Sequence, residues 1–113
     1  MRFLTSVLIL CAEAAQAWDL RPGDRAVNPG NLIGRTLTFY DDGVSTYSAG
    51  GSYSYTYSAA NGGGTAFGTF VAQPDQSVCV AFRNGFSRCD IYVRNGERLV
   101  LITETGERYP VRP

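Results

Sequence analysis

The chain contains no histidine and no lysine among its 113 residues. The absence of histidine excludes Ser-His-Asp and Cys-His catalytic arrangements and histidine metal ligands. The absence of lysine excludes a Schiff-base nucleophile and the lysine of a phosphate loop. We therefore expect no enzyme activity, no catalytic residue, no cofactor and no metal site. A hydrolase built on carboxylates alone is the remaining catalytic alternative, and no spacing of acidic residues in the sequence supports it.

Net charge is also absent, because ten arginines balance ten acidic residues. No strongly basic segment stands out, so we expect no nucleic-acid partner. Six arginines fall between Arg83 and Arg112, interleaved with carboxylates such as Asp90 and Glu104. This pattern predicts solvated cross-strand ion pairs that contribute little each, with an anion-binding groove as the alternative.

The first 17 residues, Met1 to Ala17, have the three parts of a cleavable signal peptide. Arg2 supplies the positive start, Phe3 to Ala12 the apolar run, and Ala15-Gln16-Ala17 the small residues of a cleavage site. The apolar run is shorter than the roughly 20 residues of a membrane anchor. We predict a periplasmic or secreted protein that begins near Trp18 and has no membrane span after cleavage.

Cysteine is scarce, and its placement follows from the signal peptide. Of three cysteines, Cys11 lies in the predicted leader, and Cys79 and Cys89 remain in the mature chain. A lipoprotein would use Cys11, but Leu10 is larger than the small residue which that processing requires. An even pair in an oxidising compartment predicts a Cys79 to Cys89 disulfide, with free thiols or half of a metal site as alternatives.

The mature chain divides into an arm, residues 18 to 34, and a β domain, residues 35 to 113. The arm is rich in Pro and Gly and has no period. We expect a short helical turn at its end, in which Asn28 caps, Pro29 begins the turn and Gly34 ends it. Leu32 and Ile33 are expected to face inward.

From Arg35 onward, short apolar or aromatic runs alternate with Gly and Asn turn signals every eight to twelve residues, which is typical of an all-β fold. We predict about eight strands in an antiparallel meander that forms a small barrel or sandwich. The predicted strands are Arg35 to Tyr40, Val44 to Ser48, Ser52 to Ser58, Thr65 to Ala72, Ser77 to Phe82, Phe86 to Arg94, Glu97 to Thr103 and Arg108 to Val111.

The cysteines select the register of one hairpin. If Arg83-Asn84-Gly85 forms a three-residue loop, Cys79 lies directly opposite Cys89, whereas a two-residue loop would place Cys89 opposite Val80. If the register is counted onward through a two-residue Asn95-Gly96 turn and the Thr105-Gly106 turn, the strands form two apolar faces. One holds Cys89, Ile91, Val100, Ile102, Tyr109 and Val111, and the other holds Val78, Val80, Phe82, Phe86, Tyr92, Leu99 and Leu101.

Two apolar faces are unusual for a meander with one wet side. Either an aromatic-lined barrel is covered on its outside by the arm, or a bulge exchanges the two faces partway along. The sequence leaves both alternatives open.

The sharpest local motif is Ser52 to Ser58, SYSYTYS, in which Tyr53, Tyr55 and Tyr57 share one strand face. Three such rings predict either a stacking surface for a flat ligand or a protein, or the lining of the barrel interior and its mouth. Tyr47 and Ser48 on the preceding hairpin extend the candidate binding set.

Several short stretches resemble small exported bacterial β-barrel domains of unknown function with a lipocalin-like or inhibitor-like fold. They are Leu32-Ile-Gly34, Phe39-Tyr-Asp-Asp-Gly43, Gly51-Ser-Tyr53, Gly68-Thr-Phe70, Val78-Cys-Val80 and Arg88-Cys-Asp90. Similar short sequences are sometimes named dihydrodipicolinate reductase. That enzyme family has a Rossmann nucleotide domain and a catalytic region with His and Lys, and this chain has neither residue.

A weaker resemblance is to periplasmic lysozyme inhibitors, which present a Ser-Gly-x-x-Tyr loop. Here Ser48-Ala-Gly-Gly-Ser-Tyr53 is an approximate match that lacks the Ser-Gly order. We expect a monomeric binding module whose partner is an unknown periplasmic protein or small ligand. Inhibition of lysozyme or another hydrolase is the alternative function.

Overall fold

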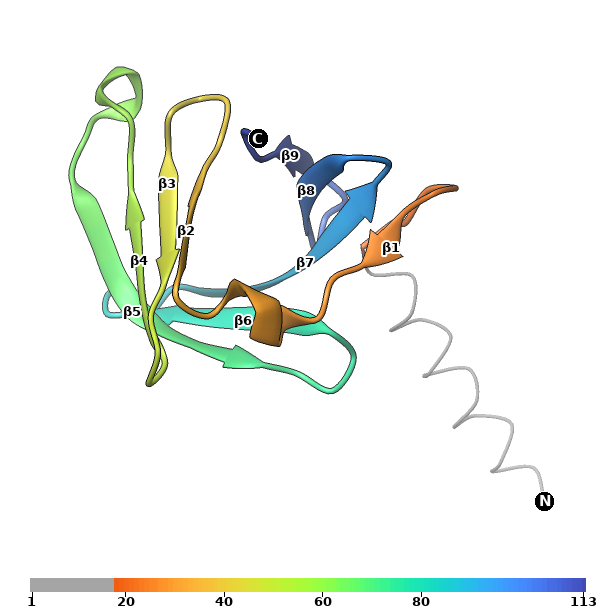
Figure 1. The fold of residues 1–113 in the computed structure, drawn as a ribbon. Coiled ribbons are helices and arrows are strands. Elements are labelled where there is room, and N and C mark those ends of the chain that lie inside the picture. The colour runs from red at the N-terminus through yellow and green to blue at the C-terminus, as the bar shows by residue number, and fades with distance from the viewer. Residues whose placement is uncertain (1–17) are drawn as a thin grey trace.

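The computed structural model describes residues 18 to 113, so the predicted signal peptide lies outside the described residues. This part of the chain is all β, with two short 3-10 turns (Figure 1). The strands are β1 (Arg25–Ala26), β2 (Arg35–Thr38), β3 (Val44–Tyr47), β4 (Ser52–Thr56), β5 (Thr65–Ala72), β6 (Ser77–Phe82), β7 (Ser87–Asn95), β8 (Arg98–Thr103) and β9 (Arg108–Pro110). The turns are η1 (Pro29–Leu32) and η2 (Ala59–Asn61). No helix within residues 18 to 113 has the length and apolar character needed to cross a membrane.

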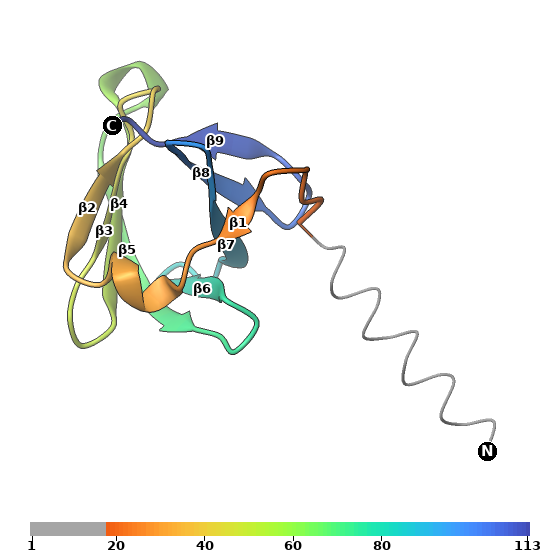
Figure 2. The same ribbon diagram turned by 45° about the vertical axis from the view of Figure 1, so that its right-hand side comes forward.

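Strands β2 to β9 form one antiparallel meander in sequence order, which confirms the predicted topology. The sheet curls into a half-barrel whose first and last strands approach each other (Figure 2). They meet at one isolated bridge, Phe39 to Val111, and the backbone N–H of Arg112 donates to the carbonyl of Thr38 at 2.7 Å. The short turns of the sequence bring successive strands together, and the twist of the sheet brings its two ends within reach.

The arm adds the extra strand. β1 pairs with the second half of β7, where β6 no longer reaches, with Ala26 opposite Val93. η1 follows as predicted, and the Asn28 side chain accepts a hydrogen bond from the backbone N–H of Gly30 at 2.9 Å. Leu32 is buried, but Ile33 is 47% exposed, so its predicted inward position is wrong. The turn is too short to bury two consecutive side chains on one side.

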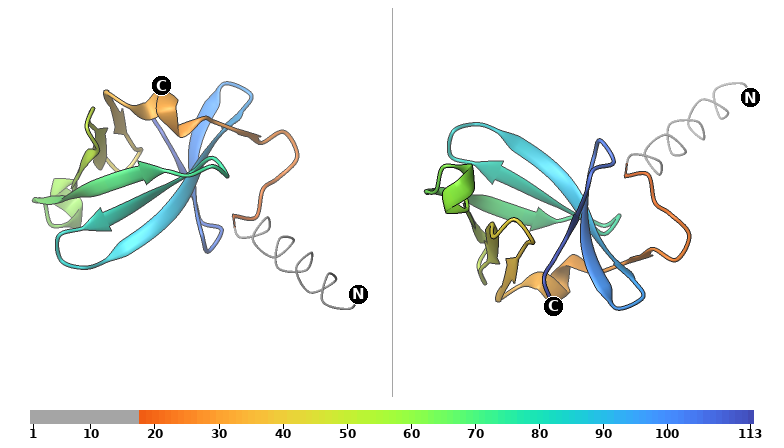
Figure 3. Two further views of the ribbon diagram at one scale, coloured as in Figure 1. Left: turned by 90° about the horizontal axis from the view of Figure 1, so that it is seen from below. Right: turned by 90° about the horizontal axis from the view of Figure 1, so that it is seen from above.

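Two apolar clusters lie on opposite faces of the sheet. The larger fills the half-barrel interior with residues such as Leu37, Phe70 and Val80. The smaller lies outside and packs Trp18 of the arm against the β7–β8 hairpin. Figure 3 shows the arm running along the outside of the sheet. Of the two alternatives left open by the sequence, coverage of the outer face by the arm is therefore confirmed.

The β6–β7 hairpin has the predicted register. Cys79 lies opposite Cys89 and forms a disulfide with it, and the loop carries Gly85 at φ 93°. The backbone N–H of Phe82 donates to the carbonyl of Phe86 at 2.8 Å, which closes the three-residue loop. A disulfide here is consistent with folding in an oxidising, extracytoplasmic compartment.

The next two hairpins differ from the prediction. Asn95 pairs with Arg98, so the turn is Gly96-Glu97 and the register moves by two residues, which preserves the faces. At the β8–β9 turn, Thr103 N–H donates to the Glu107 carbonyl around a three-residue loop. This one-residue slip turns Tyr109 and Val111 to the interior face, beside Leu101 and Leu99, so their predicted placement with Ile91 is wrong.

Candidate functional site

One cavity of about 620 Å³ opens where four turns of the meander meet. Alternate turns of a meander fall at the same end of the sheet, and the β2–β3, β4–β5, β6–β7 and β8–β9 turns all contribute to the lining. We call this cavity the mouth. It lies at the open end of the half-barrel interior, directly above the buried aromatic core.

Aromatic rings form much of the wall of the mouth: Phe39, Tyr55, Tyr57, Phe86 and Tyr109. Tyr55 and Tyr57 pack edge to face, with ring centroids 4.9 Å apart. Gly43 in the β2–β3 turn leaves room for the Tyr55 hydroxyl, because a β carbon at position 43 would overlap it. Tyr57, Phe86 and Tyr109 remain 45%, 57% and 45% exposed, so these rings are available to a ligand.

The three tyrosines of the SYSYTYS motif lie progressively closer to the opening of the mouth, along β4 and just beyond its end. Tyr53 is 2% exposed and belongs to the core, Tyr55 is half-buried at the base of the mouth, and Tyr57 is at its edge. Tyr47 is fully buried below them. Ser48 lies in the β3–β4 turn, which the meander places at the other end of the sheet, and it does not line the mouth.

Each buried phenol below the mouth has a hydroxyl partner. The hydroxyls of Tyr47 and Tyr92 are 2.7 Å apart, and the hydroxyls of Ser45 and Tyr53 are 2.8 Å apart. Burial, more than any other cause, raises the pKa of Tyr47, Tyr53 and Tyr92 above the ordinary value of tyrosine. These phenols therefore stay neutral at physiological pH and have a structural role in the core.

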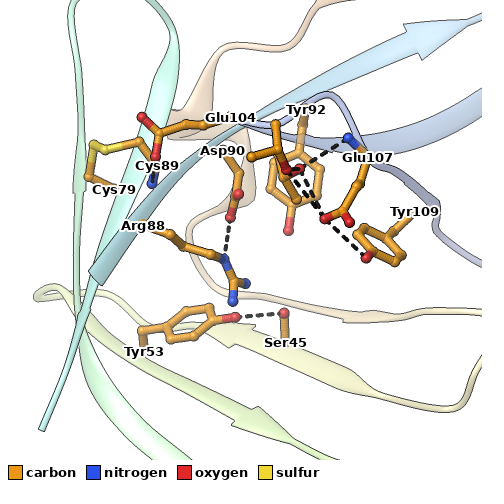
Figure 4. A network of polar contacts seen from close by, with 12 residues as sticks. Ser45, Tyr53, Cys79, Arg88, Cys89, Asp90, Tyr92, Glu104, Glu107 and Tyr109 are labelled. Atoms are coloured by element: carbon orange, nitrogen blue, oxygen red, sulfur yellow. Dashed lines mark hydrogen bonds and ion pairs between the residues drawn. A yellow bond between two sulfur atoms is a disulfide. The ribbon is translucent and has the colours of Figure 1, made fainter. Parts of the chain in front are cut away.

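An ion pair lies at the floor of the mouth. Arg88 Nε donates to Asp90 Oδ2 at 2.8 Å, and the side chains are 31% and 0% exposed (Figure 4). Asp90 Oδ1 is buried and has no hydrogen-bond partner among the described residues. Burial raises the pKa of Asp90, and the Arg88 charge opposes the rise only in part. Burial alone would lower the pKa of Arg88, but the Asp90 carboxylate raises it, so the guanidinium stays charged.

Three further carboxylates line the mouth, and we call them the rim carboxylates: Asp41, Glu104 and Glu107. Asp41 accepts from the backbone N–H of Gly43 at 2.8 Å, and Glu104 accepts from the backbone N–H of Cys89 at 3.2 Å. Glu107 accepts from Tyr109 and from nearby threonine hydroxyls at 3.4 to 3.5 Å. Within residues 18 to 113, none of the three forms an ion pair with an arginine.

The prediction of solvated ion pairs for the six arginines from Arg83 to Arg112 is wrong for two of them. Arg88 pairs with Asp90 inside the half-barrel, and Arg108 pairs with the buried Asp24 of the arm at 3.0 Å. Arg112 and Asp42 form an exposed pair, as expected. The interior position of Arg88 and Asp90 had a signal in the sequence, because the cysteine register places 88, 90 and 92 on the same face as Val78 and Val80.

A second, smaller groove of about 360 Å³ lies between β2 and β8. Arg35, Arg94 and Arg98 line it, with Glu97 as one carboxylate. It collects three of the six arginines from Arg83 to Arg112, namely Arg94, Arg98 and Arg112. The anion-binding groove considered in the sequence analysis stays a prediction. Among residues 18 to 113, no group of three or more metal-ligating side chains comes together.

Comparison with known proteins identifies no relative: no family model, curated protein or solved structure matches the chain. The resemblance inferred from short motifs is thus confirmed only as a small all-β antiparallel half-barrel domain.

Proposed function

We propose that this protein is an exported binding module that holds a small ligand with a ring or another apolar body in the mouth. One observation carries the proposal: exposed aromatic rings from separate parts of the meander converge on one concave site with a polar floor. Binding sites for small molecules typically combine an apolar wall with a few placed polar groups, in cavities of roughly 300 to 1,000 Å³. The mouth has this composition and size.

The cost of the exposed rings supports a binding role. Tyr57, Phe86 and Tyr109 leave about half of their surface in water, although the core directly below is closely packed. A fold selected for stability alone would gain by covering these rings, since each Å² of apolar surface contributes about 25 cal/mol when buried. A ligand that stacks on the rings supplies that cover.

Export is the second part of the proposal. It rests on the Met1 to Ala17 segment of the sequence and on the Cys79–Cys89 disulfide, a bond that persists outside the reducing cytoplasm. The partner is then a molecule of the periplasm or of the medium.

A fragment screen followed by NMR of the ¹⁵N-labelled mature protein tests the site. We expect ring-containing fragments to shift amide resonances of the four turns around the mouth. Tyr57→Ala should lower the affinity for these fragments about tenfold, because an exposed stacking ring is lost. Tyr40→Ala is the matched control, since Tyr40 is 54% exposed and lines the other groove. Shifts confined to the Tyr40 groove, or no shifts with any fragment, would contradict the proposal.

The hydrolase-inhibitor alternative remains a prediction. The loop that suggested it, Ser48 to Tyr53, ends in a tyrosine that is 2% exposed, so its ring cannot contact a partner without leaving the core. A lysozyme assay at stoichiometric concentration tests its main form, and full lysozyme activity in the presence of the protein would end the hypothesis of a lysozyme inhibitor.

A further inference from the structure

The charge of the mouth is unbalanced. Four carboxylates and one arginine line it. Arg88 is matched by Asp90, which leaves the rim carboxylates Asp41, Glu104 and Glu107 without a basic partner among the described residues. The whole chain has no net charge, so the excess at this site is local and not a reflection of an acidic protein.

Asp90 adds an independent observation at the floor. Its side chain is fully buried, Arg88 uses only Oδ2, and Oδ1 has no donor among the described residues. Buried carboxylate oxygens are normally satisfied, because losing the hydrogen bonds of water without replacement is costly. Asp90 lines the mouth, so a ligand donor that displaces the atoms covering Oδ1 from that side would supply the missing bond.

The aromatic wall of the mouth also favours a cationic ligand. The faces of tyrosine and phenylalanine rings carry negative charge density and attract cations. The protein already has such contacts: the Arg88 guanidinium at the floor of the mouth is 5.7 Å from the Phe82 ring centre, and Arg83 is 5.4 Å from that of Phe67. In the mouth, Tyr57, Phe86 and Tyr109 are exposed without a cation above them.

We infer that the ligand of the mouth is an organic cation, an ammonium, amidinium or guanidinium group on an apolar or aromatic body. The body stacks on the exposed rings, the charge lies among the rim carboxylates, and an N–H donates to Asp90 Oδ1. This inference rests on the proposed function and adds the chemical class of the ligand. An anionic ligand of the same shape is repelled by the rim carboxylates, and a neutral one lacks the attraction.

Three probes of one shape separate charge from shape: benzamidinium, benzamide and benzoate. Each is titrated into the ¹⁵N-labelled mature protein at low salt, and the affinity is read from amide shifts of the four turns. We expect benzamidinium to bind at least about tenfold more tightly than benzamide and benzoate to bind most weakly. The benzamidinium affinity should fall with added salt, because the rim carboxylates are exposed to solvent.

Single variants of the rim carboxylates test the source of the attraction. Asp41→Asn and Glu107→Gln should each lower benzamidinium affinity about twofold to fivefold and leave benzamide affinity unchanged. Glu97→Gln is the matched control, because it makes the same change of charge in the other groove. These side chains are exposed, so the variants are expected to fold.

Each outcome has a distinct meaning. Equal affinity of the three probes at the mouth would overturn the inference about charge and leave the proposed binding site intact. Tighter binding of benzoate would overturn it as well and would indicate Arg88 as the anchor. If none of the probes shifts a resonance of the mouth, while the fragment screen finds ligands there, the cation inference alone fails. If both experiments are negative, the proposed function fails with it.

Discussion

The hydrogen bond between Tyr47 and Tyr92 offers a sharp test of the interior. The two hydroxyls are 2.7 Å apart, and both residues are at most 1% exposed. Tyr47→Phe removes one hydroxyl and leaves the other buried without its partner. Tyr92→Phe does the reverse, and the double variant removes both.

The expected magnitudes follow from burial. A buried hydroxyl that loses its partner costs about 1–3 kcal/mol, and the phenylalanine ring preserves the packing volume. We expect each single variant to lose about 2 kcal/mol of the free energy of unfolding. The double variant leaves no hydroxyl unpaired, so it should lose no more than either single variant, which gives a coupling of at least about 2 kcal/mol. Total stability in a domain of this size is about 5–10 kcal/mol, so the losses are measurable.

Urea unfolding of the four proteins, followed by tryptophan fluorescence and by circular dichroism, measures the cycle. Trp18 is the only tryptophan and reports the outer cluster, whereas circular dichroism reports the whole sheet. Coincident transitions are needed before the free energies are compared. Additive losses in the double variant would refute the reasoning, since they would mean that the two hydroxyls do not depend on each other.

Two further predictions concern stability. The disulfide joins two residues that are 10 positions apart. Replacing Cys79 and Cys89 together by serine removes this cross-link and should lower the free energy of unfolding by about 3 kcal/mol. A loss below about 1 kcal/mol in urea unfolding would contradict this. The hydrogen bonds from Arg108 lower the pKa of Asp24 well below its ordinary value of 3.8, so the stabilisation is complete above that pH and is lost as the pH falls below it. Asp24→Asn should therefore lose less stability than the native protein between about pH 6 and about pH 3, and equal losses would refute this assignment.

Strand positions were predictable wherever Gly and Asn mark the turns, but register needs a second constraint. At the β6–β7 hairpin, the loop residues and the two cysteines agree on one register, and that prediction is confirmed. At the β8–β9 hairpin, Thr105-Gly106 is compatible with loops of two or three residues, and nothing else in the sequence decides. The slip of one residue there inverted Tyr109 and Val111.

The candidate site was predictable only in part. The SYSYTYS alternation correctly places Tyr53, Tyr55 and Tyr57 on one face, but their depth depends on the curvature of the sheet, which no local pattern encodes. The mouth combines residues from four turns, and their convergence follows from the register and coiling of all eight strands. Asp41, Glu104 and Glu107 therefore look unrelated in sequence.

Arg88 and Asp90 are charged residues at strand positions that face the apolar interior of the half-barrel. Their positions on β7 face the same interior as Tyr92, and their neighbours across the hairpin on that face are Val78 and Val80. Apolar side chains in place of a buried ion pair are often equally or more stabilising, because the pair must first be desolvated. Stability alone thus gives no reason to keep this pair, and the unpartnered Asp90 Oδ1 adds a cost. Departures from local consistency of this kind are expected at functional sites, which supports the proposed role of the polar floor in ligand binding.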